Sequence, residues 1–199
     1  GSTWTNIGSL GGTVVMTNMG TFDAADNGGS FNFNGSNYGQ INFTSTTLTS
    51  FTYVTVVKTT KVNTGYASII DFGNDNLLFN TLNNVLQLYN PNVNSGFTLT
   101  ANVWYVFALT VSSGGAVTFY VNGVSIYSTT ITPISRTNNG WGIGSGITGS
   151  EPWNGKISAI AIYHNRVLTA SEVVNISNTF QTYRVSLSSQ GNILAIGAR

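Results

Sequence analysis

The chain has no cysteine, which excludes disulfide bonds, thiolate metal sites and cysteine nucleophiles. Charged residues make up only 7% of the sequence, against about a quarter in an ordinary globular domain. The seven lysines and arginines are scattered, and the formal net charge is +1. A protein that neutralises phosphates needs clustered basic side chains. We therefore expect no nucleic-acid partner and no attraction to an anionic membrane.

The chain also has no apolar stretch long enough to cross a bilayer. The longest one, around Ile157 to Tyr163, is far short of the roughly 20 residues that a membrane-spanning helix needs. Membrane insertion is therefore not expected. The sequence does contain 41% hydrophobic and 12% aromatic residues, with a polar remainder rich in Asn, Ser, Thr and Gly. This composition predicts a packed domain with a neutral, hydrogen-bonding surface.

Short runs of β-forming residues recur at about ten-residue intervals between Gly, Asn and Ser, a spacing typical of a sandwich or barrel. The clearest hairpin is TFYVNGVSIY, where Asn122 and Gly123 suit the two positive-φ positions of a type I′ turn. The predicted strands are Thr13–Thr17, Ser30–Phe33, Tyr38–Phe43, Phe51–Thr59, Tyr66–Phe72, Leu77–Asn80, Val85–Tyr89, Gly96–Thr100, Trp104–Val111, Val117–Val121, Val124–Ile131, Gly140–Gly144 and Lys156–Tyr163.

One helix is predicted, near residues 169–181. Thr169 and Glu172 have the spacing of a capping box, in which each side chain satisfies a free backbone N–H of the other residue. An apolar stripe follows, and we expect it to lie against the strand that ends at Tyr163. In that strand, alternation places Ile157, Ala159 and Ala161 on one face, with Ile160 and Ile162 on the other. Both faces are apolar, which predicts a central strand.

Four segments together resemble a known family: GGSFNFNGSNYGQI, FTYVTVVKT, WYVFALTVSSGGAVTFYVNGVSIYS and WNGKISAIAIYHNRVLTASEV. Over about residues 30–183 the chain is similar to the laminin-G-like jelly roll of the concanavalin A-like lectin/glucanase superfamily. The resemblance implies an all-β fold, a two-sheet antiparallel jelly-roll β-sandwich with one short C-terminal helix. We expect this domain to occupy residues 1–183. The tail, residues 184–199, is expected to add an edge strand or to contact a partner.

A glycan-cleaving enzyme is the alternative function within this superfamily. Glycoside hydrolysis needs two carboxylates that face each other across a groove. The chain has six side-chain carboxylates and no E-x-D-x-x-E run, and Asp71 and Asp75, four positions apart, lie on either side of a predicted turn. Glu172 is explained by the helix cap. We therefore expect no catalytic residues and no enzymatic activity.

The single histidine, His164, ends the apolar strand. Catalytic triads and zinc sites need partners, and this chain offers no cysteine and few acids for them. We expect His164 to form a local hydrogen bond or to face solvent.

Calcium is an alternative at two clusters of acids and amides. Ca²⁺ prefers six to eight oxygen ligands from carboxylates, amides and carbonyls. The clusters are DAADNGG, with Asp23, Asp26 and Asn27, and DFGNDN, with Asp71, Asn74, Asp75 and Asn76. Neither has the spacing of a known calcium loop, and such sequences commonly form turns. Many relatives carry acids after F-x-G, where this chain has Ser36 and Asn37. We expect no cofactor, with structural calcium as the alternative.

A glycan site would use aromatic rings for sugar faces and amide or acid groups for hydroxyls. The candidate ligand-binding residues lie at predicted strand ends or loops: Tyr66, Asn74, Asp75, Tyr89, Asn90 and Trp153. Core packing is the competing interpretation for Trp153 and for Trp141. Trp104 is predicted to fill the core.

The sequence thus favours a non-enzymatic, surface-exposed module for binding, adhesion or structure. The expected partners are a glycan ligand and neighbouring virion or cell-surface proteins. The resemblance implies an extracellular or virion-surface setting, on a phage particle or a secreted bacterial protein.

Overall fold

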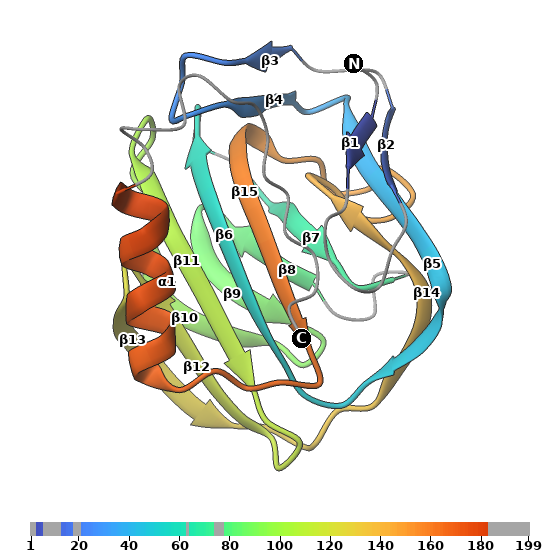
Figure 1. Cartoon of the computed structure of the whole chain (residues 1–199), viewed down its shortest axis with the longest axis vertical. Coiled ribbons are helices and arrows are strands. Elements are labelled where there is room, and N and C mark those ends of the chain that lie inside the picture. Colours follow the sequence, from blue (N-terminus) through green and yellow to red (C-terminus); the bar gives the residue numbers. More distant parts are fainter. Residues whose placement is uncertain (1–2, 6–12, 18–20, 63, 74–77, 183–199) are drawn as a thin grey trace.

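A computed structural model describes residues 3–5, 13–17, 21–62, 64–73 and 78–182. These residues form two antiparallel sheets and one helix, α1 (Ala170–Thr182) (Figure 1). In order, the eight-stranded sheet contains β1 (Thr3–Thr5), β2 (Thr13–Thr17), β5 (Tyr38–Leu48), β14 (Arg136–Ile143), β7 (Tyr66–Asp71), β8 (Leu78–Leu82), β9 (Val85–Tyr89) and β10 (Val93–Thr98). The seven-stranded sheet contains β13 (Val124–Thr130), β12 (Ala116–Val121), β11 (Trp104–Val111), β6 (Phe51–Thr59), β15 (Asn154–His164), β4 (Ser30–Asn34) and β3 (Phe22–Asp23). The predicted jelly-roll β-sandwich with one short helix is confirmed.

The main hydrophobic core lies between the two sheets. Alternate residues of each strand point to opposite faces, so each sheet has an inner face toward the core and an outer face away from it. Trp141 and Trp153 are among the largest side chains in this core, with exposures of 1% and 0%. Trp104 is not part of it and lies partly buried on the outer face of the seven-stranded sheet. The core position predicted for Trp104 was therefore wrong.

The predicted hairpin and helix are both confirmed. Asn122 and Gly123 have φ values of 51° and 82°, as the turn between β12 and β13 requires. At α1, the Thr169 backbone N–H donates to Glu172 Oε2 at 2.8 Å, and the Glu172 N–H donates to Thr169 Oγ1 at 3.3 Å. Val173 of the helix is fully buried against the outer face of β6, β11 and β15. The described part of the chain has no helix long and apolar enough to cross a membrane.

The two faces of β15 differ from the predicted ones. The pairing of β15 with β6 shifts between Ile157 and Ala159, which places a bulge at Ser158. Ile157 therefore shares the inner face with Ile160, whereas Ala159 packs under the helix. Alternation alone could not reveal this shift, because a bulge reverses the faces of every later residue. The central place of β15 is confirmed, because it lies between β6 and β4.

Two short strands, β1 and β3, were not predicted. With three and two residues, they are too short to show periodicity. The tail predicted at residues 184–199 lies outside the described residues.

Candidate functional site

The outer face of the eight-stranded sheet is divided into two parts. Over β5, β14 and β7 it is covered by the loop at residues 144–151. The Ile147 N–H donates to Asp71 Oδ2 at 2.8 Å, and Gln40 Nε2 donates to the Ile147 carbonyl. Gly142 permits this approach, because a Cβ there would lie 2.8 Å from the backbone N of Ile147. The loop ends at Glu151, whose carboxylate accepts from Ser68 Oγ at 2.9 Å.

Beyond this loop, one row of residues crosses β7, β8, β9 and β10. The strand register pairs Ser68 with Asn80, Asn80 with Gln87, and Gln87 with Asn94. Ala67, Leu86 and Leu88, which flank Ser68 and Gln87 along their strands, belong to the core, so Ser68 and Gln87 lie on the outer face. We call the side chains of Ser68, Gln87 and Asn94, which this register aligns, the amide row.

Gln87 is the most constrained member of the amide row. Its side chain is 1% exposed, and Nε2 has no hydrogen-bond partner among the described residues. Nearly all buried polar groups in proteins are paired. An unpaired buried donor costs about 1–3 kcal/mol, so a local rearrangement that gave this atom an acceptor oxygen would be favourable.

Two of the predicted ligand residues, Tyr66 and Tyr89, meet on the same face as the amide row. Tyr66 begins β7, Tyr89 ends β9, and their ring centroids are 5.6 Å apart in an edge-to-face arrangement. Tyr66 is 38% exposed. A small cleft of about 230 Å³ adjoins it, lined by Lys61, Val62, Thr64, Tyr66, Pro152 and Asn154. The result is an aromatic pair beside a polar row and a small cleft.

The other predicted ligand residues have different positions. Asn90 follows Tyr89 directly and is exposed, with a φ of 54°. Trp153 is 0% exposed in the core, so core packing, the competing interpretation, holds for this residue. Its neighbours Pro152 and Asn154 line the cleft instead. Asn74 and Asp75 lie outside the described residues. No sequence signal marked Gln87 except its isolation between apolar residues in VLQLY.

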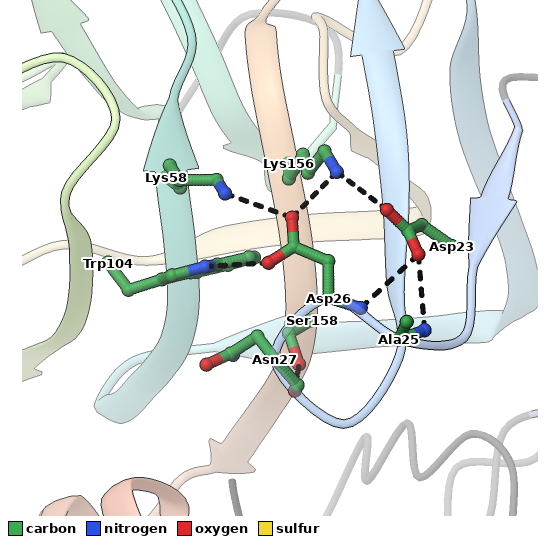
Figure 2. A network of polar contacts seen from close by, with 8 residues as sticks. All are labelled: Asp23, Ala25, Asp26, Asn27, Lys58, Trp104, Lys156 and Ser158. Carbon is green, nitrogen blue, oxygen red and sulfur yellow. Dashed lines mark hydrogen bonds and ion pairs between the residues drawn. The ribbon is translucent and has the colours of Figure 1, made fainter. Parts of the chain in front are cut away.

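In the first candidate calcium cluster, lysine side chains bind the carboxylates of Asp23 and Asp26. In Figure 2, Asp26 Oδ2 accepts from Lys58 Nζ at 2.9 Å and from Lys156 Nζ at 2.6 Å. Asp26 Oδ1 accepts from Trp104 Nε1 at 3.2 Å, and Asp23 Oδ2 accepts from Lys156 at 3.0 Å. Lys58 and Lys156 face each other on neighbouring strands, where like charges would repel. Asp26 neutralises both, so this turn holds an ion-pair network.

The network shifts the pKa values of its members. Burial disfavours ionisation of Asp26, but hydrogen bonds from Lys156, Lys58 and Trp104 outweigh it and lower the pKa. The hydrogen bond from Lys156 lowers the pKa of Asp23. The hydrogen bond to Asp26 raises the pKa of Lys156, in spite of the opposing effect of burial. All three groups are therefore held in their charged forms.

The remaining described carboxylates also have structural partners. Asp71 accepts from the backbone N–H of Gly73 and of Ile147, both at 2.8 Å. Glu151 accepts from Ser68, and Glu172 caps the helix and pairs with Arg166 at 2.6 Å. Among the described residues, no three His, Asp or Glu side chains are placed to hold a metal ion.

His164 ends β15, as predicted. Its Nε2 lies 3.0 Å from Thr46 Oγ1 on β5. Burial lowers its pKa, so the ring is neutral at physiological pH. The hydrogen bond joins the two sheets rather than neighbours in sequence.

Solved structures with a similar fold include three binding or accessory domains. Domain 4 of AbnA, a GH43 extracellular arabinanase from Geobacillus stearothermophilus, in complex with arabinotriose, is 20% identical with a TM-score of 0.67, over 85% of this chain and 90% of that chain. The botulinum neurotoxin serotype G binding domain is 16% identical with a TM-score of 0.68, over 88% of this chain and 48% of that one. A structure of botulinum neurotoxin type C, whose cell entry depends on two ganglioside molecules, is 14% identical with a TM-score of 0.64, over 90% and 51%.

At these identities the similarity shows a shared fold, and this chain spans about half the length of the two toxin chains. No curated protein matches the sequence. The family model described as the concanavalin A-like lectin/glucanases superfamily matches residues 33–174, well over half of the chain. The match covers the strands that build the amide row and the strands of Lys58 and Lys156, whereas Asp23 and Asp26 of the ion-pair network precede it. This protein belongs to the concanavalin A-like lectin/glucanase superfamily.

Proposed function

We propose that this domain is a non-catalytic glycan-binding module that works outside the cell. The observation that carries the proposal is the aromatic pair Tyr66 and Tyr89 on the same outer face as the amide row. Tyrosine rings pack against the apolar faces of sugars, and amides both donate to and accept from sugar hydroxyls. Gln87 Nε2, buried on this face, is a donor that has no partner among the described residues.

The partners of the carboxylates support the proposal that the module is non-catalytic. Each acid among the described residues is bound by lysine, arginine, serine or backbone N–H groups. A glycosidase needs one carboxyl group protonated near neutral pH and a second one facing it. The two lowered aspartate pKa values oppose that requirement.

The volume of the cleft beside Tyr66 limits the size of the group that can bind there. At about 230 Å³ it is below the roughly 300 Å³ at which drug-sized pockets begin. It therefore suits one unit of a longer sugar chain that lies over the tyrosines. The arabinotriose complex of the AbnA domain supports a sugar ligand, and the extracellular setting of that enzyme supports the location. A place on a virion stays a prediction.

The test is a glycan array, followed by titration calorimetry with the best oligosaccharide. Tyr66→Ala and Tyr89→Ala should each weaken binding by about fivefold or more, because an aromatic contact of this kind contributes about 1 kcal/mol or more. Phe22→Ala is the matched control: Phe22 has the same 38% exposure but lies in the other sheet. An array without binding, or equal losses in all three variants, would contradict the site. Release of reducing ends from a bound polysaccharide would contradict the non-catalytic assignment.

A further inference from the structure

The cleft beside Tyr66 contains a cation. It is lined by Lys61, Val62, Thr64, Tyr66, Pro152 and Asn154, and none of these six residues is acidic. The ion pairs of the described residues involve Arg166 and the other two lysines of the chain. Lys61 is exposed, and no acid among those residues lies within ion-pair distance of it. The cleft therefore has one positive charge that no described acid neutralises.

The loop that carries Lys61 is fixed at both ends. At its start, the hydroxyl of Thr59, which is 0% exposed, donates to the Lys61 carbonyl at 2.6 Å. At its end, the Gly65 N–H donates to Asn83 Oδ1 at 2.8 Å, and the Asn83 N–H donates to the Gly65 carbonyl at 3.0 Å. The backbone of Lys61 is therefore tied to the end of β6, and that of Gly65, next to Tyr66, is tied to the turn between β8 and β9.

The acid closest to the cleft in sequence is bound elsewhere. Glu151 precedes Pro152, and its carboxylate accepts from Ser68 Oγ at 2.9 Å. Ser68 is 0% exposed and belongs to the amide row. The Glu151 carboxylate thus has a partner on the sheet face, and the charge of Lys61 is left to the cleft.

The groups that line the cleft are complementary to a sugar with a negative charge. The hydroxyl of Thr64 and the amide of Asn154 can bond sugar hydroxyls, and the ring of Tyr66 can pack against an apolar sugar face. A neutral sugar offers the Lys61 ammonium group only hydroxyl oxygens. A carboxylate or sulfate would accept a charge-assisted hydrogen bond, which is shorter and stronger than one between neutral groups.

We propose that the sugar unit in this cleft is anionic, with its carboxylate or sulfate bound to the Lys61 ammonium group. This inference rests on the proposed glycan-binding function and adds the class of sugar. One cation in a cleft of about 230 Å³ suits one charged unit. A densely charged polymer would need clustered basic side chains instead.

A glycan array with matched pairs tests the charge. One arm compares galacturonate oligosaccharides with the same oligosaccharides after reduction of their carboxylates, and the other compares galactose-sulfate oligosaccharides with their desulfated forms. In at least one arm the charged member should bind about fivefold more tightly, as expected for a partly exposed ion pair. The arm that shows the preference identifies the anionic group. High salt should reduce the preference, because it screens exposed charges.

Three variants assign the preference to one side chain. Lys61→Gln should lose the preference but keep the affinity for the neutral member of each pair, whereas Lys61→Arg keeps the charge and should keep the preference. Arg136→Gln is the matched control. It removes one positive charge at the start of β14, and β7, which carries Tyr66, pairs with the opposite end of that strand. It should bind as the unchanged protein does, which excludes an effect of net charge.

Three results would overturn the inference: equal binding of both members in both arms, an unchanged preference in Lys61→Gln, or an equal loss in Arg136→Gln. If neutral glycans bind and Tyr66→Ala weakens that binding, the proposed function is retained and only the anionic sugar is rejected. An array without any binding contradicts both. The two failures are therefore distinguishable.

Discussion

Two sides of the same sandwich differ in the kind of polar group that they contain. Around β6 and β15, Lys58 and Lys156 lie side by side and are neutralised by Asp26, which the turn after β3 folds over them. Around β8–β13 no charged residue occurs, and the polar side chains there carry amides and hydroxyls. A charged group near a core must be paired, so the lysines of the first side are bound by acids of the same side. Neutral groups need no ion pair, so a polar residue such as Asn94 can stay exposed on the second side.

The largest expected difference between the two sides comes from close backbone packing. A Cβ at Gly155 of β15 would lie 2.2 Å from the Lys58 carbonyl oxygen, so neighbouring backbone must move. Gly155→Ala should lower the free energy of unfolding by about 3 kcal/mol. Gly114→Ala, in the turn of the uncharged side, is the control, because the nearest atom would be Ser112 Oγ at 3.8 Å. Urea denaturation of both variants measures this, and equal effects would contradict the close packing.

The ion-pair network should show a smaller effect that depends on pH. Asp26→Asn leaves Lys58 and Lys156 without their shared carboxylate, and should cost about 2 kcal/mol at neutral pH. The pKa of Asp26 is lowered in the folded state, so its contribution is present above the unfolded value of about 4 and is lost as the pH falls through the folded value.

As the pH falls below about 4, the free energy of unfolding should therefore decrease less steeply in Asp26→Asn than in the unchanged protein. Asp23→Asn is the matched control: Asp23 lies on the same turn but is 43% exposed and bonds only Lys156 among the lysines. It should lose less stability than Asp26→Asn. A loss as large from Asp23→Asn would show that Asp26 is not the centre of the network.

The smallest effect is expected at the helix, which packs against strands of both sides. Thr169→Ala removes the N-cap acceptor of α1 and should cost about 1 kcal/mol. Thermal unfolding followed by circular dichroism measures the loss. Thr179→Ala is a control within the same helix, because the Thr179 hydroxyl bonds only the Asn175 carbonyl one turn back. If Thr179→Ala costs as much, the capping box does not anchor the helix.

Local sequence patterns predicted most of the fold. The strands at Thr13–Thr17, Phe51–Thr59, Val85–Tyr89 and Trp104–Val111 have the predicted bounds, because β-rich runs between turn formers carry that information themselves. The hairpin at Asn122 and the cap at Thr169 held for the same reason. The bulge at Ser158 and the outer position of Trp104 were missed, because register and face depend on which strand lies beside them.

The candidate site was predicted only in part. Tyr66 and Tyr89 were chosen as separate aromatic residues, and the fold brings their rings together from two strands that are not neighbours. Trp153 looked equivalent in the sequence but packs inward. The amide row could not be predicted, because Ser68, Gln87 and Asn94 become a row only through the register of three strand pairs.

The sequence by itself determined a β-rich domain with few ionisable groups and one capped helix, because composition and local pattern are properties of the chain. Tertiary structure decided which acids meet lysines, which aromatic residues stay exposed and which strand ends a sheet. These outcomes depend on contacts between residues distant in sequence, and those contacts exist only after the two sheets have paired and packed.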